Sequence, residues 1–457
     1  MARYAPAVIA TLSLVVAIAA AAPPHAAFPY PVHQRALPNG LRVVFVPYDT
    51  PGLAAYFTFF RVGSRNEVVP GRSGFAHFFE HLTFRGTRTH SGEEWERITK
   101  SLGLDTNAFT DDDVTAYWAV GASSALPTLI ELEADRFMNL AYTEDDFKIE
   151  ARAVLGELLK SLVSPDFKAE EASRELAFTR HPYRHTTIGF EKDVRAMPGG
   201  YRYSLDLYRR FYRPDNAFVL VVGDFDEERV FESIRRHYGP WQGKGDTPAV
   251  QPEPPQASER SARFGWPTPI LPRLAAHWHT PGSADPEAVA AQLVLWPLLF
   301  GSPSPLYRDL VLERQLAQEI GGEYQPHRDP FLFGCEVVLR SAAAEAPARD
   351  ALDRAVADVA AGKIDAQLLA DVKANVLASM VMQTDTPYRT AVWLVYYTAL
   401  TGDPGYLDAV MARVARVTPE QLSAFARRWL ISQNRTTVVV ATDTRAGVAG
   451  AASEGAP

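Results

Sequence analysis

The sequence predicts an α+β protein built from two similar domains, and three observations support this prediction. The chain has 457 residues, which is too long for one ordinary hydrophobic core. Runs rich in β-branched and aromatic residues alternate with helical runs, as expected for sheets packed with helices. A proline-rich stretch at residues 243–260 divides the chain, and the end of the second part repeats the end of the first.

The first domain is expected at residues 28–242. Strands are predicted where β-branched and aromatic residues are enriched, at residues 41–46, 54–62, 106–109, 115–120 and 217–222. Helices are predicted between these strands, at residues 74–82, 92–101, 125–140, 144–163, 204–211 and 227–237.

The second domain is expected at residues 261–443, after a stiff, extended linker at residues 243–260. Residues 429–440 repeat the pattern of residues 211–222: a helix, a turn at Asn434 or Asn216, and then a β-rich run. Chance is one explanation, because helix–turn–strand units are common. The position of both copies at a domain end favours duplication of one unit. The tail at residues 444–457 is rich in alanine and glycine and is expected to be disordered.

The N-terminus has the pattern of a secretory signal peptide, which we expect at residues 1–27. Arg3 precedes an apolar run from Ala7 to Ala22 that ends in small residues. The run is shorter than the about 20 apolar residues that a spanning helix needs, so no stable membrane span is expected. The alternative is an uncleaved anchor.

The composition is that of a globular protein, with 47% hydrophobic residues and a net charge of −8. No long basic run is present, so we expect no nucleic-acid partner. The one cysteine, Cys335, cannot form an internal disulfide. It lies in an apolar run at residues 331–339, which predicts a core thiol in a strand.

The most informative motif is His-Phe-Phe-Glu-His at residues 77–81. On a helix, His77 and His81 share one face and can bind one zinc ion. Glu80 lies beside them and can act as a general base on a zinc-bound water. The order is that of the inverzincin motif. The alternative is a chance grouping on a surface helix, but the flanking apolar residues predict burial, and buried polar groups need a partner such as a metal.

A third zinc ligand is expected from another element. Glu157 is the candidate, and Glu150 lies seven residues earlier on the same helical face. Glu150 would orient a ligand from the outer shell. The spacing alone leaves open that both glutamates lie on a solvated helical face.

The chain resembles the pitrilysin–insulinase family of zinc metallopeptidases. The motifs that carry this resemblance are residues 39–44, 74–87, 107–110, 115–117, 181–183, 187–189 and 216–224. The resemblance implies His77, His81 and Glu157 as ligands of one Zn²⁺ per chain, Glu80 as the general base, and Glu150 as an outer-shell acid of the catalytic set.

The same resemblance implies two mainly antiparallel sheets with helices, in domains that face each other as a clam shell. It also implies an edge strand that binds an extended, unstructured peptide, with the substrate-binding residues Asn107, Ala108, Phe109 and Thr110. The expected activity is zinc-dependent endopeptidase activity in the bacterial periplasm or outside the cell. One alternative is a non-catalytic, chaperone-like subunit of the same fold. Another is a metal-binding protein without hydrolysis, which Glu80 disfavours.

The second half departs from the family pattern. Family members that act alone carry an arginine and a tyrosine there, seven residues apart, and the matching positions are Val311 and Gln318. Arg308, Arg314 or Tyr324 could replace them, but surface or packing roles explain these residues more simply. We therefore expect a same-fold partner subunit that supplies the arginine and tyrosine, or a homodimer.

Overall fold

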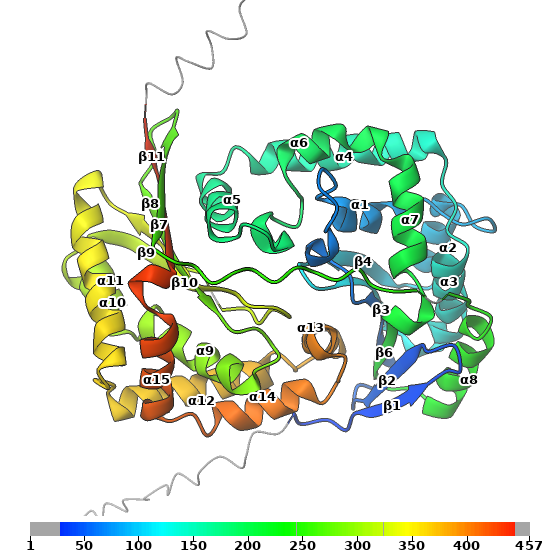
Figure 1. Ribbon diagram of the computed structural model, residues 1–457. Coiled ribbons are helices and arrows are strands. Elements are labelled where there is room, and N and C mark those ends of the chain that lie inside the picture. The colour runs from blue at the N-terminus through cyan, green and yellow to red at the C-terminus, as the bar shows by residue number, and fades with distance from the viewer. Residues whose placement is uncertain (1–27, 244, 323, 444–457) are drawn as a thin grey trace, which may run out of the picture.

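The computed structural model describes residues 28–243, 245–322 and 324–443, which form two sheets with helices packed against them (Figure 1). The predicted signal peptide at residues 1–27 and the predicted tail at residues 444–457 lie outside the described residues. None of the helices in the described part of the chain is long and apolar enough to cross a membrane.

The first sheet has its strands in the order β1 (His33–Ala36), β2 (Arg42–Pro47), β6 (Ala217–Gly223), β3 (Leu53–Phe60), β5 (Thr115–Ala122) and β4 (Asp105–Thr110). Strands β2 and β6 are parallel, and the other neighbours are antiparallel. Strand β4 is therefore an edge strand, and no described strand pairs with its free side.

The second sheet repeats this topology. Its strands lie in the order β7 (Arg260–Trp266), β11 (Arg435–Thr442), β8 (Arg273–Thr280), β10 (Phe331–Leu339) and β9 (Ala317–Gly321). Strands β7 and β11 are parallel and the rest are antiparallel, so β7 to β11 correspond in order to β2 to β6. The prediction of two similar α+β domains is confirmed, and β9 is the counterpart of β4.

The helices of the first half are α1 (Phe75–Leu82), α2 (Gly92–Ser101), α3 (Leu126–Met138), α4 (Glu144–Ser161), α5 (Pro165–Ala177), α6 (Glu191–Ala196), α7 (Tyr201–Phe211) and α8 (Glu227–Tyr238). The second half contains α9 (Pro286–Leu299), α10 (Pro305–Tyr307), α11 (Glu345–Ala360), α12 (Ala366–Met382), α13 (Pro387–Thr401), α14 (Tyr406–Val414) and α15 (Pro419–Trp429). Among the described residues between Tyr238 and Arg260 there is no helix or strand. In the first half, the sequence patterns did not predict β1, α5 or α6; in the second half they predicted only β10 and the helix–turn–strand ending.

Each half contributes a helix to the sheet of the other half. Helix α5 packs on β7, β8 and β11, whereas α13 packs on β3 and β6. The α13 contact is aromatic, because the ring of Tyr388 lies 4.7 Å from that of Trp118 and 5.9 Å from that of Phe57. Both helices lie between the two sheets in Figure 1. The first sheet thus buries one face under α13 and the other under its own helices.

The repeated domain ending has the same local structure in both halves. A helix (α7 or α15) leads to a short 3₁₀ turn and then to a central strand (β6 or β11). The side-chain amide of Asn216 donates to the carbonyl of Phe211 over 2.9 Å, and that of Asn434 donates to Trp429 over 2.8 Å. In each case the acceptor is the last residue of the helix, so the asparagine closes the helix end in the same way.

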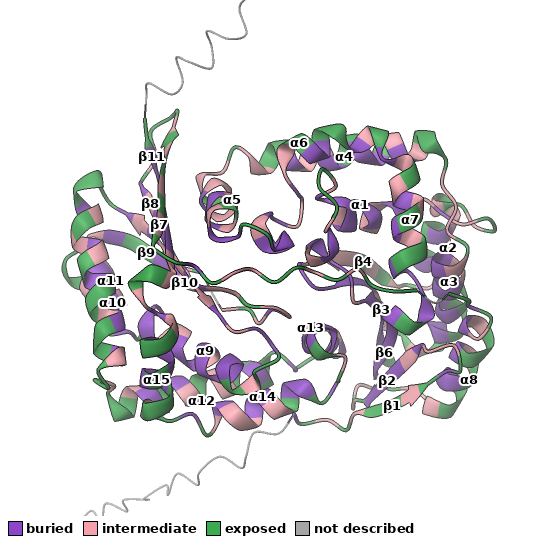
Figure 2. Ribbon diagram, viewed as in Figure 1, coloured by how far each residue is buried: buried purple, intermediate pink, exposed green. Residues whose placement is uncertain are grey.

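The buried residues include nearly all of β3 and β6 and most of α1 (Figure 2). Cys335 is buried in β10, as predicted, and burial raises the pKa of its thiol well above the ordinary value. The thiol is therefore protonated and apolar in character, which agrees with a packing role.

Candidate metal centre and active site

Helix α1 holds the motif residues because its apolar side is anchored in the core. Four large side chains of α1 are fully buried: Phe75, Phe78, Phe79 and Leu82. His77, Glu80 and His81 lie on the remaining side and are half-buried, so the burial expected for these three residues is only partial. The helix packs against α4 and β4, which brings these side chains between the two elements.

The start of α1 is held by Glu67, a residue that the motif analysis missed. The two carboxylate oxygens of Glu67 accept hydrogen bonds from the amides of Gly74 (2.7 Å) and Ala76 (2.6 Å). Gly74 has φ of 84°, and a Cβ there would lie 2.3 Å from the carbonyl oxygen of Ile188. Oxygen acceptors at a helix N-terminus satisfy backbone amides that the helix itself leaves unpaired. The sequence pattern gave little indication of this role, because Glu67 lies outside the helix.

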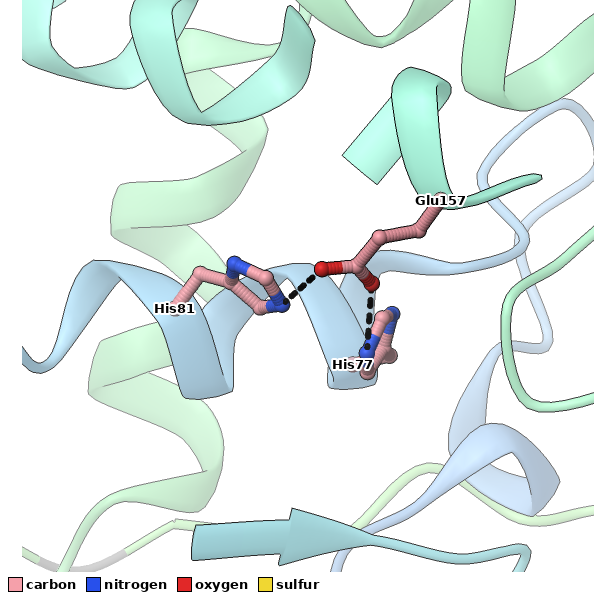
Figure 3. A group of neighbouring side chains, drawn as sticks. All are labelled: His77, His81 and Glu157. Carbon is pink, nitrogen blue, oxygen red and sulfur yellow. Dashed lines mark ion pairs between the residues drawn. The ribbon is translucent and has the colours of Figure 1, made fainter. Parts of the chain in front are cut away.

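His77, His81 and Glu157 meet in one cluster (Figure 3). The Nε2 atom of His77 lies 3.6 Å from Oε2 of Glu157, and Nε2 of His81 lies 3.7 Å from Oε1 of Glu157. One ligand atom from each residue lies within 4.8 Å of the others, and this is the one such group among the described residues. Helix α4 supplies Glu157, so the predicted third ligand faces the two histidines.

These separations fit a shared metal ion better than direct hydrogen bonds. Histidine–carboxylate hydrogen bonds are shorter than both distances. Three ligands at zinc distances in a tetrahedron lie about 3.3–3.5 Å apart, which is close to the observed spacing. Burial and the neighbouring His81 lower the pKa of His77 to about 4, so His77 is neutral, the form that binds metal. The donor set of two imidazoles and one carboxylate suits zinc.

Glu150 contacts His81 on the side away from Glu157. Its Oε2 lies 3.3 Å from Nδ1 of His81, and its other oxygen pairs with Arg85. Burial opposes ionisation of Glu150, but the hydrogen bond with His81 and the charge of Arg85 outweigh it and hold its pKa below the ordinary value. Arg85 is a second residue that the motif analysis missed.

Glu80 is held by the edge strand. The hydroxyl of Thr110, the last residue of β4, donates to Oε2 of Glu80 over 2.6 Å. Burial raises the pKa of Glu80, and the hydrogen bond from Thr110 opposes part of this rise. A carboxylate with a raised pKa is a stronger base than an exposed glutamate, and the second oxygen has no described hydrogen-bond partner.

The four predicted substrate-binding residues all lie in the edge strand β4. Thr110 points towards α1, and Ala108 packs against the core under α1. Phe109 points to the other face, where its ring stacks on Tyr396 of α13 at 5.3 Å. The side chain of Asn107 is exposed, and its Oδ1 accepts a hydrogen bond from the amide of Ala108. Of these four residues, Thr110 is the one with a described side-chain hydrogen bond to the motif.

A cavity of about 570 Å³ opens beside Glu150 and the edge strand. It extends between α2, β4 and α4, and its lining includes Phe84, Arg85, Trp95, Thr106 and Glu150. The cavity is large enough for a long amino-acid side chain. It adjoins the same strand that is free for pairing.

Val311 and Gln318 lie in the second half of the chain. Val311 lies in a short π-helical turn (Arg308–Glu313) and packs against a hydrophobic core that includes buried residues of both halves. Gln318 is exposed on β9. Figure 1 shows β9 in the second sheet, well apart from α1. Arg314 pairs with Asp309 over 2.7 Å, and Tyr324 packs against Phe333.

Known proteins resemble both halves of the chain. Residues 47–189 match the family described as Insulinase (Peptidase family M16), and residues 204–376 match the family described as Peptidase M16 inactive domain. The zinc protease PqqE of Helicobacter pylori is 31% identical over 332 residues, which cover 70% of this chain and 73% of that protein. An uncharacterised zinc protease of Streptomyces coelicolor is 26% identical over 413 residues, covering 87% of this chain and 86% of that protein.

Solved structures share the fold. A crystal structure of a protease from Helicobacter pylori matches with a TM-score of 0.84 and 27% identity, over 90% of this chain and 99% of that chain. A peptidase M16 inactive domain from Pseudomonas fluorescens matches with a TM-score of 0.80 over 90% of this chain and 98% of that chain, at only 15% identity. The resemblance predicted from the motifs is confirmed, and the chain belongs to peptidase family M16, the insulinase family.

Proposed function

We propose that the protein is a zinc-dependent endopeptidase that hydrolyses unstructured peptides. The observation that carries this proposal is the cluster of His77, His81 and Glu157 beside a held carboxylate, Glu80. The names of the relatives support it, because several are called zinc proteases. A metal-storage protein would need no base next to its ligands.

His77, His81 and Glu157 would hold one zinc ion. When bound, zinc would lower the pKa of water to about 7 and polarise the carbonyl of the scissile bond. Glu80 takes a proton from the attacking water and returns it to the leaving amine. Thr110 fixes one oxygen of Glu80 and leaves the other free for this transfer. Glu150 and Arg85 orient His81.

The substrate would bind as an added strand on the free side of β4. Such pairing reads the main chain of the peptide, which favours extended and unstructured substrates over folded proteins. Asn107, Ala108, Phe109 and Thr110 supply the pairing edge. The cavity beside Glu150 and Thr106 would take a side chain of the bound peptide.

The protein would act with a second subunit of the same fold, or as a homodimer. Val311 and Gln318 replace the arginine and tyrosine implied by the family resemblance. A partner could bring such groups to the zinc site across an interface. The N-terminal sequence pattern supports export to the periplasm or secretion.

The test is cleavage of a quenched, unstructured peptide by the mature, zinc-loaded chain beside its Glu80→Gln variant. We expect the variant to keep one zinc per chain and to lose about 10²–10⁴-fold in kcat. A matched control is Asp145→Asn, an exposed acid of α4, which should leave kcat unchanged. A zinc-loaded wild type that cleaves no peptide, either alone or mixed with same-fold subunits from the same organism, would contradict the proposal. That result would favour a non-catalytic subunit.

A further inference from the structure

A loop of the second domain reaches into the end of the edge strand of the first. This loop, residues 325–329, lies between β9 and β10, and it contacts the turn at residues 111–113 between β4 and β5. Gln325 donates to the carboxylate of Asp111 over 2.7 Å, and His327 lies 3.0 Å from Asp112. The contact joins segments that are more than 200 residues apart in sequence.

Asp112 is the centre of this contact and is 1% exposed. Arg174 of α5 donates to both of its oxygens, over 3.0 and 2.9 Å. His327 bonds one oxygen from the second domain, and the hydroxyl of Ser64 donates to the other. Burial opposes the charge of Asp112, but Arg174 and His327 outweigh it and lower its pKa well below the ordinary value. A buried carboxylate is stable only with such a full set of partners.

The neighbouring Asp113 completes the contact. Its two oxygens accept hydrogen bonds from the hydroxyl of Tyr183 over 2.8 and 2.9 Å, and Oδ2 accepts one from the backbone amide of Arg328 over 2.9 Å. From the same loop, Asp329 pairs with Arg65 at 2.6 Å and with His181 at 2.8 Å. The turn is therefore bound on one side by the first domain and on the other by the loop.

The backbone leaves the turn little freedom. The amide of Arg65 donates to the carbonyl of Asp112 over 2.9 Å. Gly63 lies so close that a Cβ there would be 2.1 Å from the carbonyl oxygen of Asp111. Thr110 directly precedes this turn, and its hydroxyl holds Glu80. A displacement of the turn therefore moves Thr110 and the hydrogen bond that fixes the proposed base.

We propose that loop 325–329, through the bond of His327 to Asp112, positions Thr110 and thereby the carboxylate of Glu80. His327 is then a positioning residue for hydrolysis, although it belongs to the second domain. This inference rests on the proposed peptidase function for its effect on catalysis. The position of the turn can be tested without activity. A misplacement of about 1 Å near a reacting group can cost about 100-fold in rate, so a small shift of the turn is enough.

The alternative is that the contact only joins the two domains. A purely structural role would lower stability when His327 is replaced but would not depend on Thr110. Arg273 provides the matched control, because it also joins the domains, from β8 to Asp166 of α5 over 2.7 Å, and it has no described hydrogen bond to the turn. Arg273→Ala should lower the melting temperature and leave kcat unchanged.

The experiment is a double-mutant cycle on the zinc-loaded enzyme with His327→Ala and Thr110→Val. We expect each change to lower kcat by about 10- to 100-fold with zinc at one per chain, and the double variant to be no more than about threefold worse than the poorer single variant. The proposal would be overturned if the loss of kcat in the double variant equalled the product of the two single losses. An unchanged kcat in His327→Ala would also overturn it. His327→Gln keeps an N–H for Asp112 and should recover most of the activity. If His327→Ala does not fold, His327→Leu replaces it in the cycle, because leucine fills the space without an N–H.

Amide hydrogen exchange separates this inference from the proposed function. We expect residues 108–114 to exchange at least about tenfold faster in His327→Ala than in the wild type, and at the wild-type rate in Arg273→Ala. If the wild type proves inactive both alone and with a same-fold subunit, the proposed function fails while this result still tests the loop. Unchanged exchange at residues 108–114 would then overturn the positioning role.

Discussion

Nδ1 of His81 lies 3.3 Å from Oε2 of Glu150, while Nε2 of the same ring faces Glu157. The two nitrogens of one imidazole thus have separate partners, one for orientation and one for the proposed metal. A carboxylate behind a metal-binding histidine fixes the tautomer and raises its strength as a ligand. This arrangement leads to the first prediction.

Replacing Glu150 by glutamine should weaken zinc binding by about 10- to 100-fold without removing it. The amide loses the charge that stabilises the ring of His81 but keeps the shape of the side chain. Competition with a chromogenic chelator measures the affinity. Asp145→Asn on the exposed side of α4 is the control and should bind zinc as the wild type does. Equal affinities for wild type and Glu150→Gln would show that Glu150 has no outer-shell role.

Zinc should raise the melting temperature of the wild type and not that of Glu157→Gln. A ligand present at about 1,000 times its Kd stabilises the folded state by about 4 kcal/mol. Without the carboxylate, two half-buried histidines of one helix remain, and they bind the ion far more weakly. Thermal unfolding with and without zinc after chelator treatment measures the effect. A similar rise in both proteins would argue against Glu157 as a ligand.

Because of the contact between His327 and Asp112, the stability of the fold should fall at both acid and alkaline pH. Burial lowers the pKa of His327, but the bond to Asp112 and the nearby carboxylates outweigh it and raise the pKa above the ordinary 6.5. Its contribution is fully present below pH 6.5 and is lost as the pH rises through the folded-state pKa. The pKa of Asp112 lies below the ordinary 3.8, so its contribution is present above that pH and is lost as the pH falls through the folded-state pKa.

The measurement is the difference in melting temperature between the wild type and His327→Gln, from about pH 4 to about pH 9. We expect the wild type to be favoured most between the two ordinary pKa values and to lose its advantage at alkaline pH. The charged groups that face His327 are Asp111, Asp112 and Asp113 of the turn. An advantage that grows above pH 7 would contradict the assignment.

Removing either repeated asparagine should destabilise its own domain end. Asn216→Ala leaves the carbonyl of Phe211 without its side-chain donor, and Asn434→Ala does the same for Trp429 and also for His279. A buried group that loses its partner costs about 1–3 kcal/mol. Thermal unfolding should show a lower melting temperature for both, and no change for Gln433→Ala, an exposed neighbour. No loss in either variant would mean that water replaces the amide.

The elements that the sequence predicted well are those with a local signal. Helix α2 begins and ends at the predicted residues 92 and 101, and β10 matches the predicted strand at residues 331–339. The pair His77 and His81 could also be placed, because four-residue spacing on a helix defines a common face regardless of the rest of the fold. Glu157 needed the family resemblance, since two glutamates seven residues apart on a helix are equally common on a solvated surface.

The tertiary structure alone decided how distant segments meet. Periodicity says which face of a strand is buried, but it does not say that α13 covers β3 or that α5 covers β8. The bonds from Thr110 to Glu80 and from His327 to Asp112 cross between elements, and no spacing in the chain encodes them. The sequence by itself determined that His77 and His81 share one face, because helical geometry is local. The order of strands and the exchange of helices between the halves determined which residues hold that chemistry in place, because those contacts depend on the packing of the whole chain.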